Sequence, residues 1–318
     1  MTNTGSAIAF LFPGQGSQAV GMGKELVDNY AVARRTFEEA DEALGYKLSQ
    51  LCFEGPEEKL RLTEITQPAI LTASVAALRV LTEKGLAPDF VAGHSLGEYS
   101  AHVAAGTLSF ADAVRTVRNR GKYMQEAVPV GVGAMAAILG MTLDQVGAVC
   151  REAAEGEVCQ PANINSPEQV VISGHAAAVE RAIKIASERG AKKAVSLPVS
   201  APFHCTLMQP AQDHLAADLR VVTFQTPRTP VVCNVDAVAV TSAESARDAL
   251  TRQVTGAVKW DASIRLLIEK GVNRFVEVGP GKVLWGLMRQ IDRSKTCFTV
   301  GDEATLQKTM SAISTAAV

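Results

Sequence analysis

Short apolar runs alternate with longer helix-forming segments along most of the chain. Runs of three to six residues that end near glycine, proline or a polar turn predict buried strands; they are Ile8–Phe12, Phe90–Ala92, Pro230–Val235 and Phe275–Val278. The segments between them predict helices, at about 23–44, 69–84, 96–105, 110–125, 208–219, 243–253, 262–270 and from 282 to 290. Strands that alternate with helices are typical of a parallel sheet covered on both faces.

The pattern changes after the glycine-rich segment Pro129–Gly133. The following 65 or so residues predict a strand, a helix, two strands, a helix and a strand, in the order β-α-β-β-α-β that is typical of a ferredoxin-like unit; the segments are 135–139, 144–154, 162–165, 170–173, 176–189 and 194–198. We therefore expect a small ferredoxin-like lobe, residues 128–199, inserted into a large lobe made of residues 1–127 and 200–318.

One predicted strand runs directly into a serine bracketed by glycines. Gly93-His94-Ser95-Leu96-Gly97 has the form G-x-S-x-G, in which a sharp strand-to-helix turn exposes the serine hydroxyl. Glycines two residues away on both sides avoid the clash that a Cβ would cause in such a turn. The turn also aims the N–H of Leu96 at any anion that forms beside Ser95. A serine that only caps a helix is the alternative, but the flanking strand and helix favour a nucleophile in a large α/β-hydrolase-like lobe with a parallel sheet.

A second glycine-rich loop, Pro13-Gly14-Gln15-Gly16-Ser17-Gln18, follows the first strand. Its spacing fits neither common nucleotide-binding pattern. The loop could place the backbone N–H of Gln15 opposite Ser95 as a second donor to an oxyanion, or it could be an ordinary connection between a strand and a helix.

Ser95 requires a general base, and His204 is the strongest candidate. It lies in the proline-containing segment where the small lobe rejoins the large one, and ligand sites concentrate in clefts between lobes. His94 is adjacent to Ser95, but neighbouring side chains on a turn diverge. No acidic residue between Ser95 and His204 stands out as a third member, so a backbone carbonyl could orient the imidazole instead. The basic helix at 110–125 offers several cations, and one arginine could turn inward to pair with a substrate carboxylate.

Composition narrows the class of protein. The 318 residues are 47% hydrophobic, which is enough to form a sizeable core. Their net charge is −2, so the chain lacks the excess of basic residues that is typical of nucleic-acid-binding proteins. The six cysteines and five histidines show no metal-ligand spacing. No segment has the features of a secretory signal or a membrane span, so we expect a soluble cytoplasmic protein.

Seven ordered motifs resemble those of the malonyl-CoA:acyl carrier protein transacylases and of the acyltransferase domains of polyketide synthases. The resemblance covers nearly the whole chain, and the motifs are Phe12-Pro13-Gly14-Gln15-Gly16-Ser17-Gln18, Thr66-Gln67-Pro68-Ala69, Gly93-His94-Ser95-Leu96-Gly97-Glu98-Tyr99, Arg120-Gly121, Gly133-Ala134-Met135, Pro202-Phe203-His204 and Glu277-Val278-Gly279-Pro280-Gly281. The length of the chain favours the free-standing enzyme of fatty acid biosynthesis.

The resemblance implies a role for eight residues. Ser95 would carry malonyl as an ester between malonyl-CoA and the phosphopantetheine thiol of acyl carrier protein, with His204 as the base and the N–H groups of Gln15 and Leu96 as the oxyanion hole. The substrate site would include Arg120, which binds the malonyl carboxylate, together with His94, Phe203 and Gln253. The main-chain carbonyl of Gln253 would orient His204, and Phe203 goes with malonyl use in polyketide relatives. No metal or bound cofactor is implied, and a monomer would suffice.

Three alternatives differ from this interpretation in kind. A serine esterase or thioesterase would share the same turn around Ser95, a discrete polyketide-synthase acyltransferase would share the chemistry, and a non-enzymatic scaffold would only dock a carrier protein. Because carrier proteins are acidic, we expect a basic rim around the site, for which Lys192 with Lys193, or Arg289 with Arg293, are candidates.

Overall fold

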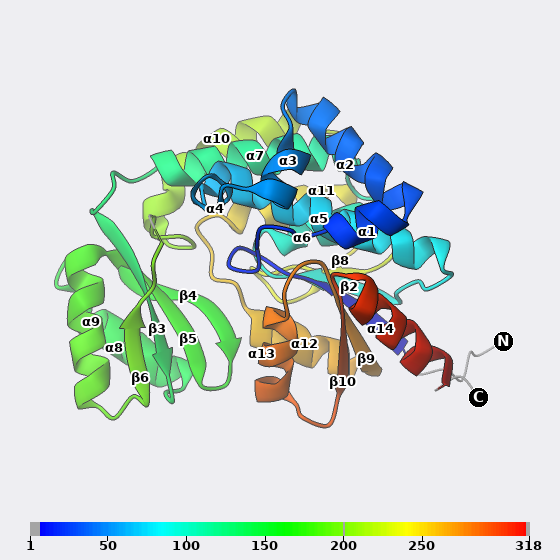
Figure 1. The fold of residues 1–318 in the computed structure, drawn as a ribbon. Helices are drawn as coiled ribbons and strands as arrows, with labels where there is room; N and C mark the ends of the chain where they lie inside the picture. The colour runs from blue at the N-terminus through cyan, green and yellow to red at the C-terminus, as the bar shows by residue number, and fades with distance from the viewer. Residues whose placement is uncertain (1–6, 200, 316–318) are drawn as a thin grey trace.

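Two separate β-sheets organise the computed structural model, which describes residues 7–199 and 201–315 (Figure 1). Ser200 and the two chain ends, all assigned above to the large lobe, lie outside the described residues. The first sheet has the order β10-β9-β1-β2-β7-β8. Its strands are β1 (Ala7–Phe12), β2 (Phe90–Gly93), β7 (Val231–Val232), β8 (Ala239–Val240), β9 (Val272–Val278) and β10 (Thr296–Val300). All neighbours are parallel except β7 and β8.

The central strand β1 is buried on both faces. Ile8, Phe10 and Phe12 belong to one hydrophobic cluster, whereas Ala9 and Leu11 belong to another on the opposite face. This alternation follows from the two-residue period of a strand, and it explains why β1 is an unbroken apolar run in the sequence.

Helices cover both faces of this sheet. On the upper side in Figure 1 lie α1 (Lys24–Asn29), α2 (Ala31–Leu44), α3 (Leu48–Glu54), α4 (Glu57–Leu60), α5 (Thr63–Glu83), α6 (Gly97–Ala104), α7 (Phe110–Glu126), α10 (Gln209–Val221) and α11 (Ala243–Arg252). On the lower side lie α12 (Trp260–Glu269) and α13 (Val283–Ile291), and α14 (Glu303–Thr315) packs beside β10. The helix α5 is long and apolar enough to cross a membrane by composition, but it is largely buried and packs against α2 and α7, as a core helix does.

The second sheet is antiparallel and has the order β4-β5-β3-β6. Its strands are β3 (Gly133–Leu139), β4 (Cys159–Ser166), β5 (Gln169–His175) and β6 (Lys193–Ser196), and α8 (Leu143–Ala154) and α9 (Ala176–Glu188) pack on them to form a separate hydrophobic core. We call this unit (residues 133–196) the small lobe and the remainder the large lobe. The expected fold class, a large α/β lobe with a parallel sheet plus a small βαββαβ lobe, is confirmed.

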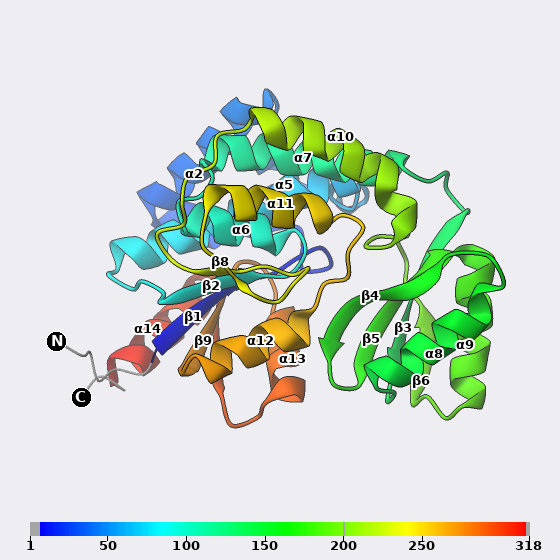
Figure 2. The ribbon, with the colours of Figure 1, turned by 180° about the vertical axis from the view of Figure 1, so that it is seen from behind.

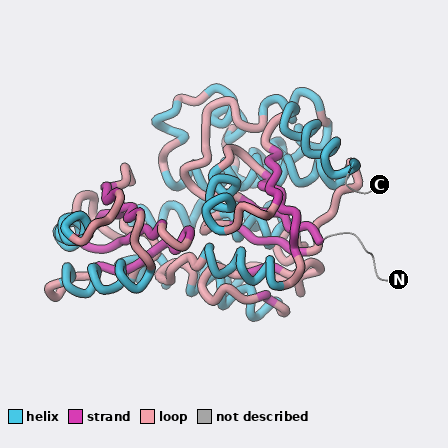
Figure 3. Tube along the Cα trace, turned by 90° about the horizontal axis from the view of Figure 1, so that it is seen from below, coloured by secondary structure: helices cyan, strands magenta, loops and turns pink. Residues whose placement is uncertain are grey.

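The two lobes lie side by side and are joined by backbone hydrogen bonds. Figure 2 shows β4 next to the α12 region, and Figure 3 shows the two groups of strands well separated. The N–H of Ile164 donates to the carbonyl of Val258 (2.9 Å), and the N–H of Val258 donates to that of Ala162 (2.8 Å). The β4 edge of the small lobe is therefore held against the segment that leads into α12.

Several element boundaries differ from the sequence prediction. The expected helix at 23–44 is interrupted at Tyr30, whose extended backbone separates α1 from α2. The expected helix at 69–84 begins already at Thr63, so Pro68 lies inside α5. The helices α3, α4 and α14 and the strands β8 and β10 were not predicted, because they are short or have weak periodicity.

Candidate active site

Ser95 lies on a strained turn between β2 and α6. Its backbone has φ 51°, in the left-handed region that non-glycine residues rarely adopt, at a typical cost of about 1–3 kcal/mol. A Cβ on Gly93 would lie 1.9 Å from the carbonyl oxygen of Gly97, and a Cβ on Gly97 would lie 2.0 Å from that of Phe12. The glycine bracket around Ser95 is therefore a steric requirement of this turn.

The imidazole of His204 lies directly against Ser95. The distance from Ser95 Oγ to His204 Nε2 is 2.7 Å, although the two residues are 109 positions apart. His204 Nδ1 lies 2.9 Å from the backbone oxygen of Gln253, and because a carbonyl only accepts, Nδ1 carries the proton. Nε2 is thus left as the acceptor for the Ser95 hydroxyl, which is the tautomer that a general base requires.

The imidazole is neutral in this environment. His204 is 2% exposed, and burial, assisted by the positive charge of Arg120, lowers its pKa from 6.5 to about 3. The backbone of His204 also has a positive φ (59°), so both members of the pair are held in strained conformations. A neutral base is therefore available at Ser95 throughout the physiological pH range.

Arg120 lies in the buried face of α7, beside the serine. Its Nη2 donates to Ser95 Oγ (3.1 Å) and to Gln253 Oε1 (2.9 Å), and its Nη1 donates to Gln67 Oε1 (2.8 Å). The side chain is almost fully buried, and among the described residues its Nε has no hydrogen-bond partner. A buried cation beside a nucleophile is suited to bind a small anionic group.

Two residues that line the same cavity, Gln15 and Leu96, have backbone N–H groups without a protein acceptor among the described residues. Leu96 immediately precedes α6, whose N-terminus carries a partial positive charge. The two loops that carry these donors are adjacent, because the N–H of His94 donates to the carbonyl of Phe12 (3.0 Å).

The cavity has a volume of about 130 Å³ and lies between the lobes. It is smaller than a typical site for a drug-sized ligand, which suits a short acyl group. The large lobe contributes most of the polar groups, and Asn163 of the small lobe adds one more. The apolar part of the wall is made by Met124, Met135, Leu197, Val199 and Phe203. His94 also lines the cavity, and its Nε2 lies 2.8 Å from Asn165 Oδ1, while burial lowers its pKa. Gln253 is fully buried behind this site and acts on it through His204 and Arg120.

Four polar residues of this site received no individual role from the sequence. Gln67 holds Arg120, and Asn165 holds His94. Asn234 Oδ1 accepts a hydrogen bond from the N–H of Ser95 (2.7 Å), and Glu98 accepts one from the N–H of Asn234 (3.0 Å). Gln67 and Glu98 carried a signal, because each lies in one of the seven motifs. Asn165 and Asn234 lie outside these motifs and reach the site only in the fold.

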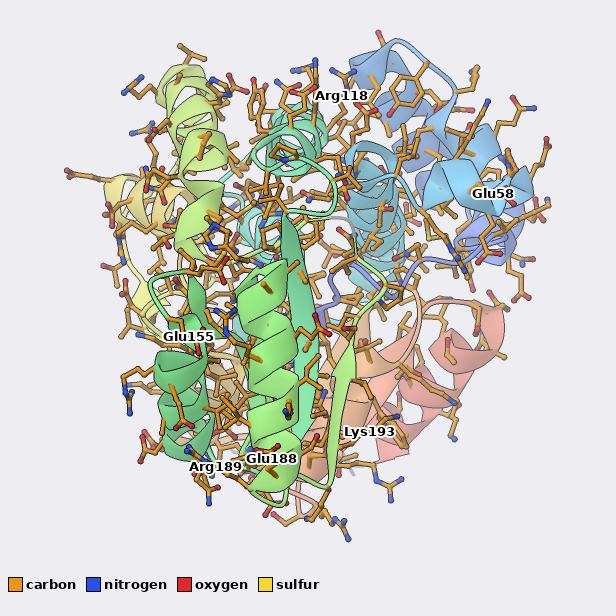
Figure 4. All side chains as sticks on the ribbon, turned by 90° about the vertical axis from the view of Figure 1, so that its left-hand side faces the viewer. Glu58, Arg118, Glu155, Glu188, Arg189 and Lys193 are labelled. Atoms are coloured by element: carbon orange, nitrogen blue, oxygen red, sulfur yellow. The ribbon has the colours of Figure 1, made fainter. Side chains whose placement is uncertain are left out.

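The candidate basic rim residues differ in how free they are. Lys193 is exposed on the edge strand β6, as Figure 4 shows. Lys192 lies 2.7 Å from Glu168, Arg289 stacks on Trp285, and Arg293 donates to the carbonyl of Arg289. Lys192, Arg289 and Arg293 therefore already have intramolecular contacts.

Comparison with known proteins places the chain among acyltransferases. Residues 9–313 match the acyl transferase domain. The chain is 52% identical to the malonyl CoA-acyl carrier protein transacylase of Escherichia coli O157:H7 over 299 residues, which cover 94% of this chain and 97% of the relative. The structure of the malonyl CoA-acyl carrier protein transacylase from Coxiella burnetii has a TM-score of 0.95 and 45% identity, and the match covers 97% of this chain and 98% of that one.

A second similar structure contains a partner. A malonyl-transacylase solved in complex with its type II polyketide synthase acyl carrier protein has a TM-score of 0.94 and 48% identity, with 96% of this chain and 100% of that chain covered. The matched residues 9–313 span both lobes and all positions of the site described above.

Proposed function

The chain belongs to the acyl transferase family and, within it, to the malonyl-CoA:acyl carrier protein transacylases, and from this premise we propose how it moves malonyl from malonyl-CoA to the phosphopantetheine thiol of acyl carrier protein in fatty acid biosynthesis. The observation that carries the mechanism is the 2.7 Å contact between Ser95 Oγ and His204 Nε2, with the Arg120 guanidinium on the same hydroxyl.

In the first half-reaction, Ser95 Oγ attacks the thioester carbonyl of malonyl-CoA while His204 Nε2 takes the hydroxyl proton. The carbon–sulfur bond then breaks, and the protonated His204 returns the proton to the leaving thiolate. The carbonyl of Gln253 keeps the imidazole in the correct tautomer and orientation through both proton transfers. This places a neutral amide where hydrolases of the triad type have a carboxylate.

We assign the oxyanion hole to the N–H groups of Gln15 and Leu96. Both line the cavity beside Ser95, and both are free to donate to the negative oxygen of the tetrahedral intermediate. Loss of one such donor typically costs about 10²–10³ in rate. A fixed pair of donors requires little reorganisation during the reaction.

Arg120 would bind the free carboxylate of the malonyl group. Its position next to Ser95 allows the guanidinium to exchange its contact with Ser95 Oγ for a paired contact with the substrate. His94 and Phe203 would complete the wall around the acyl chain. The carboxylate would thus both select the substrate and hold it beside the nucleophile.

In the second half-reaction, the thiol of the carrier protein replaces coenzyme A. His204 deprotonates the thiol, the sulfur attacks the malonyl ester, and Ser95 Oγ regains its proton from His204. Because one acyl group stays bound while two thiols exchange, the cleft between the lobes must admit a long pantetheine arm. The exposed Lys193 supports the docking of an acidic carrier protein on the small lobe.

The remaining proposals concern the organisation of the protein. All the groups of the site come from one chain, which supports a monomer as the active unit. The separate sheets and cores support the division into residues 1–127 with 200–318 and residues 128–199. The burial of α5 supports a soluble enzyme of the cytoplasm.

Release of coenzyme A in the absence of a carrier protein tests the proposed function. The transferase predicts a burst of about one coenzyme A per enzyme followed by near-arrest, because the malonyl ester waits for a thiol. Steady release without acceptor would instead identify a serine esterase or thioesterase. Retention of function in Ser95→Ala would identify a non-enzymatic scaffold.

A further inference from the structure

A fully buried carboxylate lies behind the nucleophile. Glu98 follows Ser95 by three residues on the first turn of α6 and is not among the residues that line the cavity. Its Oε2 accepts two hydrogen bonds, from the backbone N–H of Asn234 (3.0 Å) and from Gln253 Nε2 (2.8 Å). One oxygen atom therefore links α6 to the loop after β7 and to the end of α11.

The first of these partners holds the strained turn. Asn234 Oδ1 accepts from the N–H of Ser95 (2.7 Å), and Asn234 Nδ2 donates to the carbonyl of Gly93 (2.7 Å). Asn234 thus bridges the backbone on both sides of His94, across the turn that gives Ser95 its positive φ. A conformation of this kind persists only where the surrounding contacts enforce it.

The second partner reaches all three residues of the proposed chemistry. Gln253 Nε2 donates to the carbonyl of Ser95 (2.9 Å), and Gln253 Oε1 accepts from Arg120. Its backbone oxygen accepts from His204 Nδ1. A rotation of the Gln253 side chain would therefore disturb the serine and the arginine together, and a shift of its backbone would disturb the base.

We propose that Glu98 is a positioning residue for the transfer: its Oε2 fixes Asn234 and Gln253, and through them it fixes the strained turn at Ser95, the imidazole of His204 and the guanidinium of Arg120. This inference rests on the proposed function. Glu98 touches neither substrate nor reacting atoms, so its effect passes entirely through the two amides.

The role requires an acceptor oxygen and does not require a negative charge. Burial raises the pKa of Glu98 to about 7, against the lowering effect of the bonds from Asn234 and Gln253 and of the nearby Arg120. A proton on Oε1, which has no hydrogen-bond partner among the described residues, leaves Oε2 free to accept in either form. The nearest ionisable nitrogen to Oε1 is His102 Nε2 at 4.0 Å, and burial lowers the pKa of that histidine to about 3, so it is neutral.

Two substitutions of similar size separate the acceptor from the bulk of the side chain. Glu98→Gln keeps an oxygen for both donors, so we expect the rate of the coenzyme A burst to stay within a few-fold of wild type. Glu98→Met removes the acceptor, and we expect the burst rate to fall about 10²-fold, the typical effect of a small displacement of reacting groups. Amide exchange at residues 93–98 should accelerate in Glu98→Met and not in Glu98→Gln, because the N–H of Ser95 is held by Asn234.

Glu277 provides a matched control. Like Glu98, it is a fully buried glutamate. It accepts hydrogen bonds from the backbone N–H groups of Leu284 (3.0 Å) and Trp285 (2.8 Å), which lie at the start of α13. Glu277→Met should lower the unfolding temperature while the folded enzyme keeps its burst rate. A comparable fall in burst rate in Glu277→Met would show that the effect of Glu98→Met is a general loss of stability, and would overturn the proposal.

The remaining outcomes are also decisive. Equal burst rates in wild type and Glu98→Met, or equal losses in Glu98→Met and Glu98→Gln, would overturn the role of the acceptor. If Glu98→Met does not fold, Glu98→Asp, which withdraws the carboxylate by one methylene, should lower the rate; a wild-type rate would contradict the proposal. Absence of any burst in the wild type would instead refute the proposed function, and the amide-exchange comparison would still test Glu98.

Discussion

Replacement of Arg120 by methionine removes the only described cation that touches the nucleophile while keeping a side chain of similar length. The substrate carboxylate would lose a paired contact with a buried guanidinium. A hydrogen bond to a charged group contributes about 1.5–3 kcal/mol, so two bonds at the low end of this range amount to about 3 kcal/mol. Since 1.4 kcal/mol corresponds to a factor of ten, kcat/KM for malonyl-CoA should fall about 10²-fold.

Comparison with an acyl group that lacks the carboxylate isolates this effect. Arg120→Met also removes a donor from Ser95 Oγ and leaves Gln67 Oε1 without its described partner, and both losses affect every substrate. The ratio of kcat/KM for malonyl-CoA over acetyl-CoA cancels these common losses. We expect this ratio, measured from the rate of coenzyme A release with a saturating carrier protein, to fall about 10²-fold.

Arg118→Met is the matched control. Arg118 lies on the same helix, and its side chain is 41% exposed and points outward in Figure 4. Its nearest acidic partner is Glu64 at 3.8 Å. This variant should keep the malonyl-to-acetyl ratio of the wild type. An unchanged ratio in Arg120→Met would refute the assignment of the carboxylate contact to Arg120.

Three further predictions concern the base, the turn and a buried acid. Because the pKa of His204 is lowered to about 3, the base is already deprotonated at pH 5, and the rate of acylation should be nearly constant from pH 5 to 8; a half-maximal rate near pH 6.5 would contradict this. Gly97→Ala places a Cβ 2.0 Å from a backbone oxygen and should lower the free energy of unfolding in urea by about 3 kcal/mol or more. In Gly286→Ala the new Cβ meets no atom within 4 Å, so this variant should raise the free energy of unfolding by about 0.5–1 kcal/mol. Equal effects of the two substitutions would be incompatible with the turn geometry. Burial raises the pKa of Glu277 from 4.5 to about 7. The protonated side chain therefore stabilises the folded state fully below pH 4.5, and this stabilisation is lost as the pH rises through 7. Glu277→Gln should reduce the loss of unfolding free energy between pH 5 and 8, and an unchanged pH dependence would count against this pKa.

The parts of the fold with strong local signals could be predicted from the sequence. The apolar run of β1 and the βαββαβ order of the small lobe follow from periodicity alone. The start of α5 was mispredicted because proline is favoured at the first position of a helix, and here the helix has an additional turn before Pro68. Strand β10 was missed because four of its five residues are only partly buried or exposed, so its sequence lacks a clear alternation.

The candidate site shows a similar division. The glycines around Ser95 reflect a local steric constraint, so five consecutive residues are enough to indicate the turn. Arg120 shares the buried face of α7 with Val117 and Met124. The residues of this helix alone leave the choice among its arginines open, and only the family resemblance identifies Arg120.

Long-range hydrogen bonds are the part that the sequence does not contain. An acidic residue such as Glu98 is common at a helix N-terminus, and an asparagine such as Asn234 is common in turns, so neither residue suggests a special role. Their contact joins positions 136 residues apart, and only the packing of β7 and α6 in the large lobe brings them together. The same holds for the carbonyl of Gln253, whose distance to His204 depends on how α11 ends.

Mass spectrometry after a brief incubation with malonyl-CoA tests the central claim most directly. The mechanism predicts one malonyl group per chain, located on the peptide that contains Ser95, absent from Ser95→Ala, and lost to the phosphopantetheine thiol when the acyl carrier protein is added. A malonyl group on another residue, or continuous release of coenzyme A with no adduct on Ser95, would contradict it.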